Sequence, residues 1–222
     1  MMFLALFVVF ACVAAAIWFQ GFWNGIVAFM NILLAAMIAT NLWEPLTTMV
    51  ENFGAASWTY MLDFVLLWFL FFAVFAVLRG ITDLLSRTQV KFELPLEMAG
   101  RSVMALLCGW LMVCFVAFTL QMAPLNSAEP LGAWSSPNSK SFLVAAPERL
   151  WMRFMFDRSR GAFARGHYSD RPQHPSDQSL NVEAFDPLSE FALKYRQRRD
   201  EFQKQTDMRV GSAPEPAAAG QP

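Results

Sequence analysis

Four long hydrophobic runs occupy the first part of the chain. They cover Met2–Phe19, Phe22–Leu42, Trp58–Leu78 and Ser102–Leu120, and Asp63 is the only charged residue within them. A helix needs about 20 apolar residues to cross the hydrocarbon core of a membrane, because it rises about 1.5 Å per residue. The runs are apolar on every side, which is typical of helices in lipid. The pattern predicts an all-α polytopic membrane protein with about four transmembrane helices.

The first run could also be a secretory signal, with Ala14-Ala15-Ala16 as a small-residue cleavage site. However, it has no basic residue ahead of it, and a second span follows almost at once. We therefore expect the first run to be retained as a transmembrane helix. The connection to the second run is very short, and Gly21 and Gly25 allow the tight turn of an antiparallel helical hairpin.

The chain becomes polar after residue 125. Thirteen of its 17 Lys and Arg residues lie beyond Pro124, so the hydrophobic part and the tail form separate regions at 1–125 and 126–210. Residues 211–222 have the composition of a disordered end. In the tail, Pro147–Arg160 and Pro187–Lys204 are predicted amphipathic helices that begin with proline. The first of them suits either a membrane surface or packing against the rest of the tail.

The charge of the short loops predicts how the helices are oriented across the membrane. The loop at 40–57 has no Lys or Arg, whereas the loop at 79–101 carries all four basic residues of the hydrophobic region, Arg79, Arg87, Lys91 and Arg101. Short loops rich in Lys and Arg stay in the cytoplasm. The amino terminus and the tail are therefore expected outside, which in a bacterium is the periplasm.

Two polar side chains lie within the predicted spans. Asp63 is the single acid, and an acid in a membrane is a candidate for function because burying its charge is costly. It lies only about five residues inside its helix, so we expect it to remain near headgroups and water. Asn31 lies in the middle of the second span, where a hydrogen bond to a neighbouring helix is favoured over a contact with a substrate.

Small residues on two spans predict close helix packing. Gly100, Ala105 and Gly109 line the start of the fourth span, and the second span carries four alanines. Small side chains let helices approach closely where lipid provides no hydrophobic driving force. The pattern leaves open whether the partners belong to one chain or to a homo-oligomer. The four alanines are Ala28, Ala35, Ala36 and Ala39.

The composition, with 56% hydrophobic and 16% charged residues, excludes an ordinary soluble domain. Cys12, Cys108 and Cys114 lie in apolar runs and are expected to act as small hydrophobic side chains. No catalytic, phosphate-binding or nucleic-acid-binding motif is present, so we expect no catalysis, no cofactor and no nucleic-acid partner. A metal site is not expected at His167, Asp170, His174 and Asp177, because Pro172 and Pro175 break any helix that would align them.

Four short segments occur in a characteristic order. Gly-Phe-Trp-Asn-Gly forms the first turn at 21–25, and Trp-Glu-Pro-Leu follows the second span at 43–46. The third span contains a Phe-rich segment at 69–72, and Leu-Glu-Met-Ala-Gly at 96–100 leads into the fourth. In this order, residues 1–125 resemble the colicin V production protein family, the CvpA-like membrane proteins of bacteria. The chain departs from that family at Gln20, where a basic residue is common, and at Met104 and Cys108, where glycines often continue.

The resemblance implies a non-enzymatic protein of the bacterial inner membrane that takes part in toxin (bacteriocin) biosynthesis or export and in envelope function. Its partners would be membrane lipids, a second copy of the chain, or an envelope or secretion protein. Two alternatives stay open on the residues alone. Asp63, Asn31 and the small-residue faces are compatible with a small oligomeric channel or transporter, and the tail is compatible with an anchor for a periplasmic partner.

The orientation leads to a direct test. A reporter fused after Pro222 should be active only if it is of a type that functions outside the cytoplasm. The basic loop at 79–101 is expected in the cytoplasm, which places the carboxyl terminus on the opposite side of the membrane. Paired fusions, one active in the cytoplasm and one outside, measure this. A cytoplasmic signal would mean that the first run is cleaved or that the whole bundle is inverted.

Overall fold

The computed structural model describes residues 2–52, 59–85, 94–123 and 146–159, together with residues 185, 191, 194, 195 and 197. Five α-helices lie in these ranges, and the described residues contain no strand. Four are long and apolar enough to cross a membrane, over Phe3–Gln20, Phe22–Trp43, Leu62–Leu85 and Leu94–Met122. The chain is therefore an all-α polytopic protein, as its hydrophobic pattern predicts. The helices are α1 (Met2–Gln20), α2 (Phe22–Asn52), α3 (Thr59–Leu85), α4 (Leu94–Met122) and α5 (Pro147–Ser159).

Three of the helices are longer than the predicted spans. α2 continues through Pro45 to Asn52, because a proline within a helix removes one backbone hydrogen bond without preventing further turns. α3 continues past the predicted end of its span to Leu85. α4 begins at Leu94 rather than Ser102, and Pro95 lies in its first turn, where proline is tolerated. The sequence therefore identified the spans correctly but placed these helix ends too early or too late.

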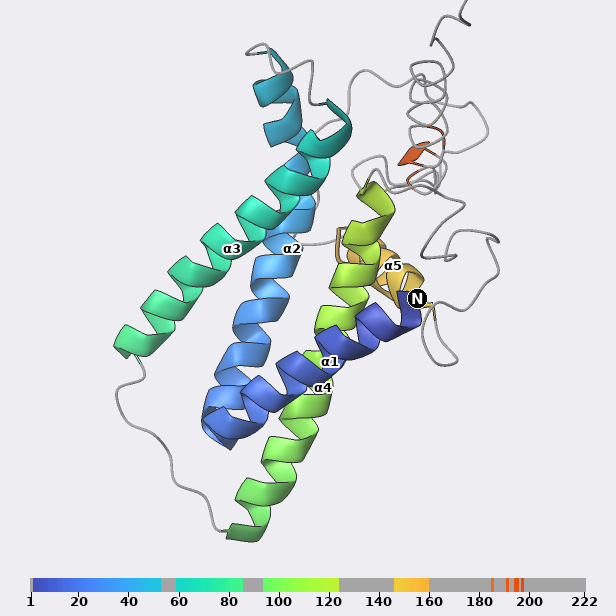
Figure 1. Ribbon diagram of the computed structural model, residues 1–222. Coiled ribbons are helices and arrows are strands. Elements are labelled where there is room, and N and C mark those ends of the chain that lie inside the picture. Colours follow the sequence, from blue (N-terminus) through green and yellow to red (C-terminus); the bar gives the residue numbers. More distant parts are fainter. Residues whose placement is uncertain are drawn as a thin grey trace, which may run out of the picture.

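The helices pack in two main pairs that α2 and α4 connect. α3 packs along α2, α1 packs along α4, and α2 and α4 contact each other (Figure 1). α5 packs against α4. Aromatic rings also join α3 to α4, since the ring centroids of Phe71 and Phe115 lie 4.8 Å apart and those of Trp68 and Phe115 lie 5.7 Å apart. Such packing is the main source of cohesion between helices in lipid.

A buried side-chain hydrogen bond links α2 to α3. Asn31 is 2% exposed, and its Nδ2 donates to Oγ1 of Thr82 at 3.0 Å. The Thr82 hydroxyl itself donates to the backbone oxygen of Arg79 at 3.0 Å. Asn31 therefore joins two helices of the same chain, which agrees with the structural role predicted for it. Its partner lies in the part of α3 beyond the predicted span.

We expect Asn31→Ala and Thr82→Val to show a coupling energy of about 0.6–2 kcal/mol in a double-mutant cycle, because each removes the same interhelical hydrogen bond. The measurement is the free energy of unfolding in bicelles or mixed detergent. Thr47→Val is the control, since the Thr47 hydroxyl donates only within its own helix, to the Trp43 backbone oxygen. Coupling of Asn31→Ala with Thr47→Val as large as that with Thr82→Val would contradict this assignment.

Candidate functional site

The turn between α1 and α2 depends on a glycine. Gly21 has a φ of 93°, a left-handed conformation that glycine adopts without steric cost. A Cβ atom at this position would also lie 3.3 Å from Oε1 of Glu97. The backbone oxygen of Gly21 accepts a hydrogen bond from the backbone N–H of Gly25 at 3.0 Å, which begins α2. Both predicted turn glycines therefore lie where the chain reverses.

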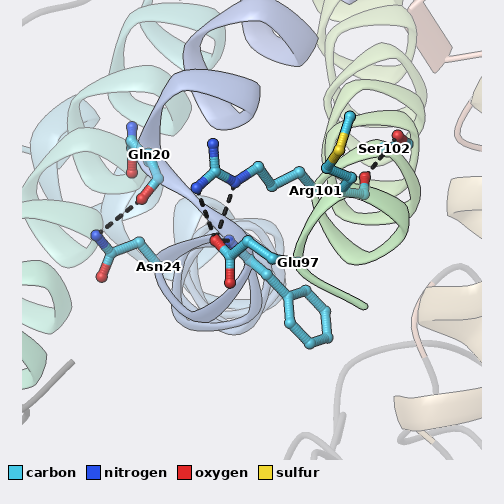
Figure 2. Close-up of polar contacts among 7 residues, drawn as sticks. Gln20, Asn24, Glu97, Arg101 and Ser102 are labelled. Atoms are coloured by element: carbon cyan, nitrogen blue, oxygen red, sulfur yellow. Dashed lines mark hydrogen bonds and ion pairs between the residues drawn. The ribbon is translucent and has the colours of Figure 1, made fainter. Parts of the chain in front are cut away.

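Glu97 on α4 holds this turn against the fourth helix. Its Oε1 accepts hydrogen bonds from the backbone N–H of Phe22 at 3.2 Å and from Nε of Arg101 at 2.9 Å. Nη2 of Arg101 lies 2.8 Å from the same oxygen (Figure 2). The first N–H groups of a helix lack partners within that helix and carry partial positive charge. Glu97 therefore caps α2 from a different helix, and Arg101 balances its charge.

Gly100 allows the closest approach at this junction. A Cβ atom on Gly100 would lie 2.4–2.7 Å from three atoms of the Phe22 ring, which is too close for any residue except glycine unless the ring moves. Gly25 lies opposite Met104, where an added Cβ atom would be 3.0 Å from the Met104 Cβ. Two positions on α2 thus face two positions on α4 with almost no free space.

The other small residues lie at helix contacts within the chain. A Cβ atom on Gly109 would lie 2.9 Å from the Phe10 ring of α1, and Ala105 is 4% exposed. The predicted alanines of α2 are buried in the same core. The small-residue faces therefore bring α1, α2 and α4 together within one chain. These alanines are Ala28, Ala35, Ala36 and Ala39.

Two of the four predicted basic-loop residues belong to helices. Arg79 lies on α3, where its Nε is 3.2 Å from Oδ2 of Asp83, and Arg101 lies on α4. Arg87 and Lys91 lie outside the described residues. The turn at Gly21, the end of α3 and the start of α4 share one end of the bundle (Figure 1). The two basic-loop residues in the described part, Arg79 and Arg101, are thus at the same end as the α1–α2 turn.

Asp63 lies at the opposite end and is not exposed to water in the folded chain. It is 2% exposed, and its Oδ2 accepts a hydrogen bond from the Tyr195 hydroxyl at 2.8 Å. The prediction that Asp63 stays near water was wrong, because Tyr195 of the tail covers it. The Tyr195 ring also lies 6.2 Å from the Trp43 ring of α2, centroid to centroid. The tail therefore contacts both α2 and α3 at this position.

The first tail helix is seated on the transmembrane helices. α5 ends at Ser159, close to the predicted Arg160. Trp151 and Met155 are 2% and 1% exposed, and Nε1 of Trp151 donates to Oγ1 of Thr40 at 3.3 Å. The Trp151 ring lies edge-on to Phe115, with centroids 5.6 Å apart. The apolar face of α5 thus packs on α2 and α4, which the prediction did not include, while Ser159 at its end contacts the tail, as one of the two alternatives predicted.

Two further tail aromatic residues contact the carboxyl-terminal part of α4. Phe191 stacks on Phe118 with centroids 4.9 Å apart, and Phe185 lies 6.2 Å from the same ring. The backbone N–H of Phe185 donates to Oγ of Ser159 at 2.6 Å, which ties this segment to the end of α5. Phe191 and Tyr195 are helical, as predicted, while most of the predicted helix Pro187–Lys204 lies outside the described residues.

Within the described part of the chain, no group of three or more His, Cys, Asp or Glu side chains is placed to hold a metal ion. The loop with His167, Asp170, His174 and Asp177 lies outside that part. Two of the three cysteines, at positions 108 and 114, are buried in the apolar core, as expected of small hydrophobic side chains.

No protein-family model, curated protein or solved structure matches this chain. The resemblance to the CvpA-like proteins therefore rests on the residue pattern alone.

Sequence reasoning missed the partners of the polar residues. The spacing of Glu97 and Arg101, with the acid four residues before the base, does predict an ion pair on one helix. Nothing in that spacing indicates the backbone N–H of Phe22, which lies 75 positions away. Tyr195 is likewise 132 positions from Asp63. Periodicity along the chain carries no signal for such distant contacts.

We expect Gly100→Ala to lower the free energy of unfolding by about 1–3 kcal/mol, because the added methyl group overpacks the contact with the Phe22 ring. Gly80→Ala is the matched control. Gly80 also lies within a helix, but an added Cβ atom would meet nothing within 4 Å, so this change should be neutral or slightly stabilising.

The same unfolding measurement should show that Phe22→Ala reduces the cost of Gly100→Ala, since the smaller side chain leaves room for the methyl group. Equal effects at Gly100 and Gly80, or strict additivity of Phe22→Ala and Gly100→Ala, would show that the close approach is unimportant for stability.

Proposed function

We propose that this chain is a non-enzymatic accessory protein of a bacterial inner membrane, similar to the CvpA-like proteins, that supports toxin (bacteriocin) production or export through its role in the envelope. One observation supports this proposal most. Two of the segments on which the resemblance rests, 21–25 and 96–100, contact each other through the Phe22–Glu97 hydrogen bond and the Phe22–Gly100 packing. If this chain and the CvpA-like proteins have the same architecture, two segments in which they resemble each other are expected to contact each other in the fold.

The use of the polar side chains agrees with a scaffolding role. Asn31 bonds to Thr82, Glu97 bonds to Arg101 and the α2 backbone, and Asp63 accepts a hydrogen bond from Tyr195. Polar groups within a membrane protein either serve a substrate pathway or hold elements together. Here each of them holds elements of the chain together. The channel or transporter alternative relied on Asn31, Asp63 and the small-residue faces, and each of these contacts another helix or the tail of the same chain.

The proposed orientation places the tail in the periplasm. The α1–α2 turn, Arg79 and Arg101 share one end of the bundle, and α5 packs closer to the other. The basic end would be cytoplasmic. The surface formed by α5 and the tail would then be available to envelope components on the outer side.

Deletion of the gene in its native host should reduce toxin export or increase sensitivity to membrane-active detergents, and the wild-type chain should restore both. We expect Glu97→Gln to complement poorly, because the neutral amide loses the charge that pairs with Arg101 and caps α2. Asp83→Asn is the control, since Asp83 forms an ion pair at the same end of the bundle but only within α3.

Immunoblots of the membrane fraction verify that the variants reach equal levels in these strains. Unchanged secretion together with unchanged stress tolerance in the deletion strain would rule the proposal out. Full complementation by Glu97→Gln would show that the Phe22–Glu97 contact has no part in the function.

A further inference from the structure

The outward face of α5 carries arginines between two apolar flanks. Trp151 and Met155 point into the bundle, so the opposite side of the helix presents Arg149 and Arg153, which are both exposed. Leu150 is 46% exposed on one flank of this stripe. On that flank lies Phe154, and on the other lie Met152 and Phe156, all three partly exposed.

The charges on this face are not balanced within the described residues. Arg149 and Arg153 form no ion pair there, and Arg158 lies 5.9 Å above the centroid of the Phe154 ring. Asp157 is the one exposed acid of α5, and Glu148 is buried on the inner face. The exposed side of α5 is therefore positively charged.

The position of α5 along the bundle places this face near a membrane boundary. Glu97 and Arg101 form a charged cluster at one end of the bundle, with Gln20 and Asn24 beside it (Figure 2). Phe115, which contacts Trp151, lies about 21 Å along α4 from Arg101, at about 1.5 Å per residue. By the same measure Thr40 lies about 27 Å along α2 from Phe22. The hydrocarbon core is about 30 Å thick. α5 therefore lies near the opposite interface.

We propose that the outward face of α5 is a binding surface for anionic phospholipid headgroups. Arg149 and Arg153 contact the headgroup phosphates, while Leu150 and Phe154 lie against the upper part of the acyl chains. Arginine suits this role because its planar guanidinium donates two parallel hydrogen bonds to phosphate oxygens. An amphipathic helix with a basic stripe and apolar flanks is typical of the membrane interface.

This inference goes beyond the proposed function and does not depend on it, because it requires only a membrane with anionic lipid in the leaflet beside α5. The packing of α5 on α2 and α4 also fixes the position of this surface in the folded chain. A free amphipathic helix must first bind the membrane, whereas α5 is held at the boundary by the Trp151–Thr40 hydrogen bond and the Phe115 contact.

The test uses the full chain in liposomes of phosphatidylcholine with a small fraction of spin-labelled phosphatidylglycerol or spin-labelled phosphatidylcholine. The motionally restricted fraction of each label gives the preference of the protein for anionic lipid. We expect a preference of about two- to fivefold for phosphatidylglycerol, reduced by high salt because the contacts are electrostatic.

We expect the double variant R149Q/R153Q to lose most of this preference and R149K/R153K to keep most of it, because only the first removes charge. A further control, R79Q, removes a cation at the other end of the bundle and should change the preference less than R149Q/R153Q. Circular dichroism verifies that each variant remains helical. A wild-type chain without preference, or R149Q/R153Q with the full preference, would overturn the proposal and leave the face to an acidic protein partner.

Discussion

The contact of the Glu97 carboxylate with the amino terminus of α2 is the one on which the arrangement of α1, α2 and α4 depends. It joins the α1–α2 turn to α4, which packs against both α1 and α2. The first N–H groups of a helix have no partner within that helix and carry partial positive charge, which the carboxylate satisfies. Gly21 lets the chain turn at this point, and Gly100 leaves the space that the Phe22 ring occupies. Polar capping and close packing thus act at the same place.

The remaining polar contacts join α3, α5 and Tyr195 of the tail to the bundle in the same way. Asn31 connects α2 to α3, Thr40 connects α2 to α5, and Asp63 connects α3 to Tyr195. Lipid provides no hydrophobic driving force between apolar helices, so each added element needs close packing and a specific polar contact. The aromatic rings of Trp68, Phe71 and Phe115 supply the packing between α3 and α4.

Residues of the tail bury side chains of the four long helices. Tyr195 turns Asp63 from a residue expected near water into a buried hydrogen-bond acceptor. Trp151 and Phe191 pack on the rings of Phe115 and Phe118, which are both fully buried. The hydrophobic region and at least these parts of the tail therefore form one packed unit, whose outer side carries the arginines of α5.

The sequence by itself determined the number of spans, the glycine turn at Gly21 and the first tail helix, because each depends on residues close together in the chain. A run of about 20 apolar residues, a glycine between two such runs and a proline before an amphipathic segment are local signals. Only the tertiary structure decided that α2 runs on to Asn52, that Glu97 caps α2, and that Tyr195 covers Asp63. These features depend on residues far apart in the chain, whose contacts form only when the helices pack.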